Sequence, residues 1–300
     1  MTQIKKFTWL IDLLKREALT VNEISARWAD NRNLSEGKPL SRATFCRWRE
    51  AISTQLGLSI KCNTHDGYTY YIDNDDAITG DTVSRWMVNT YAVCNVLTDN
   101  RDIRQRISVP QIPSGQTHLV DILSAIRYNK EVRITYCHFG GEPYDVTISP
   151  MCVRLYDSRW YVIGVREDGE HRTYSLDRVR SVSTTGRDSV VDKDFDADEY
   201  FRDSFGIVMQ DAVKPCCIVL RTYGSHINYM RTLPLHHSQN ELAGGKDAHG
   251  EYVDFEYYMS PTYDLVMHIA GLGAMVKVLK PASLADEVVE WLGKAREMYT

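Results

Sequence analysis

Apolar residues recur every three or four positions in three stretches of the first sixty residues, which is the spacing of one face of an α-helix. We therefore predict helices over 3–16, 19–31 and 41–57. Thr20 and Glu23 have the spacing of a capping box at the start of the second helix, and Ser41 can cap the third. The predicted buried faces consist of Ile4, Phe7, Ile11 and Leu14, then Ile24 and Trp28, then Phe45, Trp48 and Ile52.

Two strand-like runs follow these helices, over 58–62 and 68–72, with the turn residues Asp66 and Gly67 between them. Three helices followed by a β-hairpin are the layout of a winged helix-turn-helix, whose third helix enters the major groove of DNA. We predict such a DNA-binding domain over 1–75; an ordinary helical domain with a solvated basic face is the alternative. The candidate DNA contacts are Arg42, Thr44, Arg47 and Arg49 on the third helix and Lys61 and His65 on the hairpin.

Charge is distributed unevenly along the chain. The whole chain carries a formal net charge of −5, whereas residues 1–73 carry 11 Lys and Arg against 8 Asp and Glu, a net of +3. The remaining residues therefore carry a net of −8. This asymmetry argues against a protein that coats nucleic acid over its whole surface, and it favours a local polyanion-binding surface near the N-terminus.

A further helical pattern covers 79–107, where Val83, Met87, Tyr91 and Cys94 are spaced by threes and fours. Two prolines and a glycine in the stretch 108–116 interrupt the chain after it. We predict that 76–116 is a helical connector. It could form a dimer interface, act as a signal lever, or pack within its own domain, and the sequence leaves these alternatives open.

Period-2 alternation follows a predicted helix over 117–128. Five short strands are predicted, with the sequences EVRITYC, YDVTISP, CVRLY, RWYVIGV and RTYSL. Tight turns separate them and the run WYVIGV is apolar on both sides, so we predict a small, bent β-barrel of the SH3 or Sm type over 117–195. The residues predicted to share a face are Val132, Ile134 and Tyr136 on the first strand and Tyr144, Val146 and Ile148 on the second.

The last part of the chain, 196–300, alternates strands and helices in the order βαββαβ and ends in a helix that begins near Pro281. That order predicts a ferredoxin-like domain, and the whole chain a multidomain α+β protein. His236 and His237 are placed on a predicted strand, where neighbouring side chains point to opposite faces, so we expect no metal site there.

The stretch RWYVIG, followed by RTYSLDRV, resembles the signature of WYL-domain transcriptional regulators, with Trp160, Tyr161 and Val162 in the place of Trp-Tyr-Leu. AIRYNKEVRITY and ISP also resemble that family. EYFRDSFGI, LPLHHSQ and VLKPASLADEVVEWL resemble the C-terminal extension that these regulators carry. With the predicted winged helix, the resemblance covers nearly the whole chain. The chain is similar to WYL repressors associated with phage defence.

The resemblance implies a domain that senses a nucleic-acid or nucleotide-like effector in a basic, aromatic-lined groove. Arginine planes suit phosphates and bases, and tyrosines supply stacking surfaces and hydroxyl donors. Tyr136 and Tyr174 could equally be core residues, and Arg178 could form an ion pair with Asp177 instead of contacting a ligand. Trp160 is expected in the core. The candidate effector contacts are Tyr136, Arg159, Tyr161, Arg172, Tyr174 and Arg178, of which Arg172 is favoured because it is a cation beside an acidic loop.

The function expected from these features is a homodimeric, sequence-specific regulator of transcription that reads an inverted repeat, with repression relieved by the effector. Activation on binding single-stranded DNA is one alternative. An adaptor that acts on a protein partner is another. Catalytic motifs such as GxSxG, the P-loop and HExxH are missing from the sequence, so neither enzymatic activity nor a cofactor is expected.

The seven cysteines stand at 46, 62, 94, 137, 152, 216 and 217, with no CxxC pair and no zinc-ligand spacing. They are expected to be reduced thiols, mostly in the core. The sequence has no apolar run near the length of a membrane helix and no signal-peptide core at its start, so a cytoplasmic protein is expected.

Overall fold

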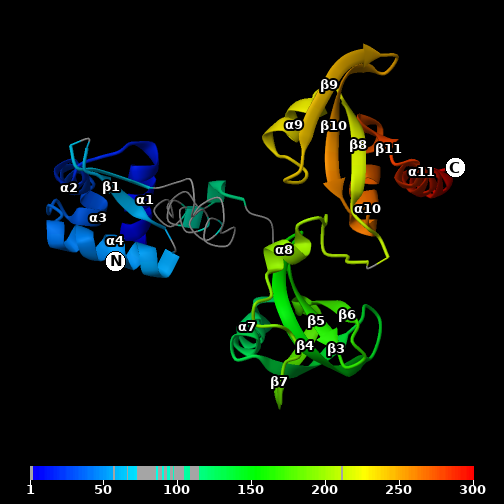
Figure 1. The fold of residues 1–300 in the computed structure, drawn as a ribbon, viewed down its shortest axis with the longest axis horizontal. Coiled ribbons are helices and arrows are strands. Elements are labelled where there is room, and N and C mark those ends of the chain that lie inside the picture. Colours follow the sequence, from blue (N-terminus) through cyan, green and yellow to red (C-terminus); the bar gives the residue numbers. More distant parts are fainter. Residues whose placement is uncertain are drawn as a thin grey trace. The chain divides into compact units, whose positions relative to one another are not determined.

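The computed structural model of the chain describes residues 3–56, 58–65, 67–72, 115–210 and 212–300, with positions 86, 90, 93, 94, 97 and 105–108 between them. The chain divides into two compact units, residues 1–110 and 111–300. Figure 1 draws the first from blue to cyan and the second from green to red. The predicted connector helix and the break at 108–116 lie mostly outside the described residues.

The first unit contains the three predicted helices and the predicted hairpin. One short helix, α3, was not predicted, because Leu34 is its only apolar residue and four residues are too few to show an apolar period. The elements are α1 (Gln3–Arg16), α2 (Val21–Asp30), α3 (Arg32–Ser35), α4 (Arg42–Leu56), β1 (Ile60–Asn63) and β2 (Thr69–Ile72), with β1 and β2 antiparallel.

Aromatic residues fill the core of the first unit. The Trp28 ring lies edge-on to the rings of both Trp9 and Trp48, each at 5.0 Å between centroids. Phe45 of α4 packs on Tyr70 of β2 at 4.7 Å, so the hairpin is fixed to the helix. The predicted capping box is confirmed, since Thr20 Oγ1 accepts from the Glu23 backbone N–H at 3.3 Å and Glu23 Oε2 accepts from that of Thr20 at 2.8 Å.

The second unit begins with the 3₁₀ turn η2 (Gly115–His118) and α7 (Leu119–Arg127), and then forms a five-stranded antiparallel sheet in the order β6-β5-β4-β3-β7. The strands are β3 (Lys130–Cys137), β4 (Pro143–Tyr156), β5 (Arg159–Arg166), β6 (His171–Ser175) and β7 (Val179–Asp188), and the short turn η3 (Leu176–Arg178) joins β6 to β7.

The strand prediction was wrong in two places. The runs YDVTISP and CVRLY belong to the single strand β4, because a register shift between Pro150 and Cys152 carries the strand past the proline. The strand β7 was missed because most of its side chains are polar and exposed and it contains Gly186. The predicted shared faces are confirmed, since β3 and β4 pair Val132 with Ile148, Ile134 with Val146 and Tyr136 with Tyr144.

Each face of this sheet has its own core. Val162 and Tyr174 belong to the cluster under α7, whereas Ile163 packs with Cys152, Met151 and Phe201 on the opposite face. The apolar run WYVIGV is therefore buried on both sides, as predicted. Trp160 is only partly buried at the margin of the first cluster.

A segment from α8 (Ala197–Phe201) to residue 215 joins this sheet to the last domain and is anchored to both. On the sheet side, the Arg154 guanidinium carbon lies 3.9 Å from the centroid of the Phe201 ring. On the other side, Asp264 Oδ2 accepts the backbone N–H groups of Ile207 and Val208 at 2.7 and 2.8 Å. Gly206 has φ 81°, and a Cβ at this position would overlap the Asp264 carboxylate, so the close approach requires glycine.

The last domain is a four-stranded antiparallel sheet in the order β11-β8-β10-β9, with the order of elements that the sequence predicts. Apolar residues of α9, α10 and α11 pack with alternate residues of β8 and β10, so the three helices share one face of the sheet. The elements are β8 (Cys216–Tyr223), α9 (His226–Thr232), β9 (Asn240–Asp247), β10 (Gly250–Met259), α10 (Tyr263–Leu272), the turn η4 (Gly273–Met275), β11 (Val276–Lys280) and α11 (Ala282–Glu297).

Two expectations about individual side chains were wrong. His236 and His237 lie in a turn before β9, not on a strand, and their ring centroids are 4.1 Å apart, because Pro234 and Ser238 interrupt the strand pattern. Of the seven cysteines only Cys152 is buried, so they are not mainly core residues. Within the described part of the chain, no group of three His, Cys, Asp or Glu side chains could hold a metal ion. No helix in that part is long and apolar enough to cross a membrane.

Candidate functional site

The exposed face of α4 carries two of the predicted DNA contacts. Arg42 and Arg47 are exposed, and neither forms an ion pair with another described residue. Thr44 is partly buried and belongs to the helix start, because its hydroxyl accepts from Ser41 Oγ at 2.9 Å and from Arg47 Nη2 at 3.1 Å. The Ser41 cap is confirmed, since its hydroxyl oxygen accepts the Thr44 backbone N–H at 3.2 Å.

The hairpin lies beside one edge of that face. Arg49, partly buried, places its guanidinium carbon 5.9 Å from the centroid of the Tyr70 ring on β2. Lys61 on β1 and His65 in the turn are both exposed. The structure therefore brings Arg42, Arg49 and the hairpin to the same side, while Arg47, five residues beyond Arg42, lies farther round the helix.

The second candidate site surrounds Arg178, at the junction of η3 and β7. Its guanidinium carbon lies 5.1 Å from the centroid of the Tyr136 ring and 4.6 Å from that of Phe139. Arg178 Nε is buried without a hydrogen-bond partner among the described residues. A buried, unpaired guanidinium N–H is costly unless a ligand or a water accepts it.

The ion pair between Arg178 and its neighbour Asp177 does not form. Asp177 instead accepts from Arg159 Nη1 at 3.1 Å and from the hydroxyl of Ser175. Of the two alternatives for Arg178, the structural ion pair with Asp177 is therefore the wrong one. Asp177 fixes Arg159, and the positive charge of Arg178 stays without an acidic partner among the described residues.

Aromatic rings surround this arginine. Tyr136 is edge-on to Tyr174 at 5.1 Å and to Tyr144 at 6.0 Å, and the His138 ring stacks on Tyr144 at 5.2 Å. Burial raises the pKa of Tyr174 to about 12, and it raises the pKa of Tyr136 against the opposing effect of Arg178. Both phenols therefore stay neutral at physiological pH.

The structure brings only part of the predicted effector contacts together. Tyr136, Tyr174 and Arg178 lie together. Both tyrosines are also buried in the core, so being a core residue does not separate them from the candidate site. Burial raises the pKa of Tyr161, and Arg159 is the main charge that opposes it, which places these two side chains near each other. Arg172 shares a face of β6 with Tyr174, but its Nη2 lies 2.5 Å from Glu170 Oε2 and the side chain is 54% exposed. Glu170, in the acidic loop for which Arg172 was favoured as an effector contact, therefore forms an ion pair with Arg172.

Sequence reasoning missed three residues of this site: His138, Phe139 and Tyr144. His138 and Phe139 lie in the turn between β3 and β4, and Tyr144 is the second residue of β4, where the alternation explained it as a strand residue. The available signal was the phenylalanine itself, since a large apolar side chain beside Gly140 and Gly141 in a short polar turn has no core to enter.

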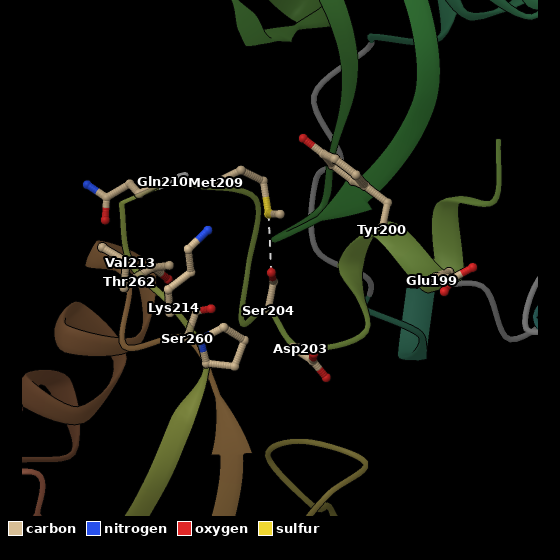
Figure 2. A pocket seen from close by; sticks show the side chains of 11 residues that line it. Glu199, Tyr200, Asp203, Ser204, Met209, Gln210, Val213, Lys214, Ser260 and Thr262 are labelled. Carbon is tan, nitrogen blue, oxygen red and sulfur yellow. Dashed lines mark hydrogen bonds between the residues drawn. The ribbon is translucent and has the colours of Figure 1, made fainter. Parts of the chain in front are cut away.

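A separate pocket of about 200 Å³ lies where the 199–215 segment meets the last domain (Figure 2). Its lining has mixed charge, with Glu199 and Asp203 opposing Lys214. Inside it, the Ser204 hydroxyl donates to the sulfur of Met209 at 3.2 Å. The pocket is a packing feature of the linking segment, and it contains none of the predicted effector contacts.

Comparisons with known proteins identify two domains. Residues 117–184 match the WYL domain family and residues 215–296 match the WCX domain family. The resemblance derived from RWYVIG and RTYSLDRV is thereby confirmed for the middle domain, and that of the C-terminal extension for the last one. No curated protein matches the chain.

Among the 16 solved chains that match is proteasome accessory factor B/C (PafBC) of Arthrobacter aurescens, at 17% identity and a TM-score of 0.35. That match covers 96% of this chain and 45% of PafBC, so this chain spans less than half of its length. A CRISPR Cas-related protein matches at 12% identity and a TM-score of 0.39, with 87% of this chain and 74% of that one covered.

Proposed function

We propose that this chain, which contains a WYL domain and a WCX domain, is a sequence-specific DNA-binding regulator of transcription whose activity a nucleic-acid or nucleotide-like effector controls. In this proposal residues 1–75 form a winged helix-turn-helix, the five-stranded sheet is the Sm-like WYL barrel, and the WCX domain is ferredoxin-like. The chain binds its ligands and does not transform them, and it acts in the cytoplasm.

The observation that carries the proposal is the state of Arg178 inside the WYL domain. A guanidinium between two aromatic rings, without an acidic partner and with Nε unsatisfied, is suited to a phosphate or another anion. A structural arginine is normally paired, as Arg159 is with Asp177.

The first unit supports the DNA-binding half of the proposal. Its helices and hairpin have the order of a winged helix, and Arg42 and Arg47 are exposed on α4 without acidic partners among the described residues. We propose that two copies read an inverted repeat with two-fold symmetry and repress transcription until the effector binds. In the alternative, the same sites are used, but binding of single-stranded DNA switches transcription on.

The test is a gel shift on the DNA upstream of the chain's own gene, repeated over a series of salt concentrations. Tight binding to one inverted repeat that weakens with salt supports an operator-reading regulator. Weak binding without sequence preference would contradict it and would favour the adaptor alternative, in which the first unit binds a protein.

The matched variants are Arg47→Ala, on the exposed face of α4, and Arg16→Ala, an exposed cation at the end of α1. Both remove one positive charge from the same unit. If Arg47 contacts a phosphate, its loss lowers affinity for all sequences and reduces the salt slope by about 1. If it contacts a base, affinity for the repeat falls by about 1–3 kcal/mol and specificity relaxes. An equal effect of both variants would remove Arg47 from the interface.

A further inference from the structure

We propose that Phe139 is the stacking platform for a nucleobase, and that the WYL site therefore takes a base tethered to a phosphate instead of an anion alone. The inference rests on the proposed effector function and adds a specificity-determining residue to it. The phosphate contacts Arg178, and the base stacks on the face of the Phe139 ring that Arg178 does not cover.

Exposure is the first observation. Phe139 is 76% exposed, whereas the Tyr136 ring, which the same guanidinium contacts, is buried. Its described contact is with Arg178, whose guanidinium carbon lies 4.6 Å from the ring centroid. One ring face therefore meets the cation, and most of the remaining ring is open to solvent. Single exposed apolar side chains are common on protein surfaces, so the exposure shows that this ring face is available to an occupant, and the cation beside it indicates the chemistry of that occupant.

The turn that carries the ring is braced by its own backbone and by the neighbouring side chains. The Gly141 backbone N–H donates to the His138 carbonyl at 3.1 Å and closes the turn, in which Gly140 has φ 70°. His138 in turn stacks on Tyr144, and its Nε2 lies 3.0 Å from the Tyr144 hydroxyl. A ring held on a short, braced turn loses little conformational freedom when a ligand stacks on it.

The charge at the site selects the ligand class. Arg178 supplies a cation without an acidic partner among the described residues, and its buried Nε–H requires an acceptor. A phosphate pairs with the positive charge of this guanidinium, and Phe139 supplies a π-face beside the same guanidinium. Base stacking on an aromatic side chain is tolerant of sequence, because every base has a π-face. A nucleotide or a single strand satisfies both features, whereas inorganic phosphate satisfies only the first.

The experiment measures binding of the full chain to three probes by fluorescence anisotropy or calorimetry. The probes are a short oligothymidylate, an abasic phosphodiester of the same length, and thymidine monophosphate. The variants are Phe139→Ala, Phe139→Trp and Arg178→Gln. Tyr229→Ala is the matched control, because Tyr229 is a similarly exposed aromatic residue on α9, away from Arg178.

We expect Phe139→Ala to weaken oligothymidylate binding about 5- to 100-fold, which is the loss of one stacked base, and to leave abasic binding unchanged. Phe139→Trp keeps the affinity, Arg178→Gln weakens binding to both strands, and Tyr229→Ala changes neither. Binding of thymidine monophosphate with the same dependence on Phe139 identifies a free nucleotide as sufficient, whereas its absence assigns the site to a strand.

Two results separate the possible failures. If the wild-type chain binds oligothymidylate and Phe139→Ala binds it equally well, the stacking role is wrong while the proposed effector function stands. If the wild-type chain binds none of the three probes, the nucleic-acid effector itself is wrong. An unchanged thermal midpoint of Phe139→Ala, expected for an exposed side chain, shows that a loss of binding is not a loss of fold.

Discussion

The role of a charged side chain in this protein depends on which ion-pair partner the fold places beside it. Asp177 is the sequence neighbour of Arg178, yet it pairs with Arg159 across the start of β5. That choice leaves Arg178 available between Tyr136 and Phe139. Asp177 and Arg178 both belong to the short turn η3, where successive side chains leave the backbone in different directions, so sequence proximity is a poor guide to ion pairing.

Gly206 gives a prediction at the residue scale. Gly206→Ala places a methyl group against the Asp264 carboxylate at φ 81°, whereas Gly186→Ala meets a similar φ of 85° with open space around it. In both variants the alanine must adopt a left-handed backbone conformation, which should lower stability by about 1–2 kcal/mol. Gly206→Ala should lose about 1–3 kcal/mol more through overpacking. Denaturant unfolding of the two variants measures the difference, and equal losses would show that the Asp264 contact is not tight.

Two partly desolvated imidazoles, those of His236 and His268, predict a loss of stability in acid. Burial lowers the pKa of His236 and of His268 below the usual 6.5. The folded state therefore disfavours the proton that the unfolded chain accepts, so stability is fully present above about pH 6.5 and is lost as the pH falls through the lower folded pKa values. The thermal midpoint should decrease as the pH is lowered from 7 to 5.

His236→Gln tests the assignment, because its amide can still donate to the Arg202 carbonyl that His236 Nε2 contacts at 2.8 Å. The midpoint of this variant should depend less on pH than that of the wild type. An identical pH dependence would mean that His236 does not contribute.

At the scale of elements, local patterns located the helices and most strands, and failures occurred where the pattern was interrupted. The proline at 150 was interpreted as a strand end, but β4 passes through it by a register shift. The polar strand β7 has almost no buried alternation, and its place beside β3 comes from pairing with a strand more than forty residues away. Such pairing is non-local and leaves no periodic signal in the strand itself.

The attachment of the linking segment to α10 gives a prediction at this scale. Asp264→Ala removes the acceptor of two backbone N–H groups, those of Ile207 and Val208. Each unpaired, partly buried donor costs about 1–3 kcal/mol, so the second unit should be clearly destabilised. Asp286→Ala, an exposed carboxylate on α11, should change stability by no more than about 0.5 kcal/mol. Comparable effects of the two substitutions would contradict a structural role for Asp264.

At the scale of the whole molecule, the chain consists of two units with separate cores. A fragment of residues 111–300 should therefore fold alone, with the near-ultraviolet dichroism of its buried tyrosines intact. It should bind oligothymidylate as the full chain does and should not bind the operator. A fragment that is unfolded, or that still binds the inverted repeat, would show that the two functions are not divided in this way.

The sequence by itself determined the α+β class, the positions of the three N-terminal helices and their hairpin, the WYL domain with its C-terminal extension, and an arginine- and tyrosine-rich candidate site. These follow from periodicities, caps and turns, which involve residues that are close in the sequence and can therefore be recognised without the fold. Only the tertiary structure decided that Arg159 and not Arg178 pairs with Asp177, that Glu170 neutralises Arg172, and that Phe139 lies on Arg178. Those outcomes depend on which side chains meet when distant strands pair, and the distances that govern ion pairs and stacking exist only in the folded chain.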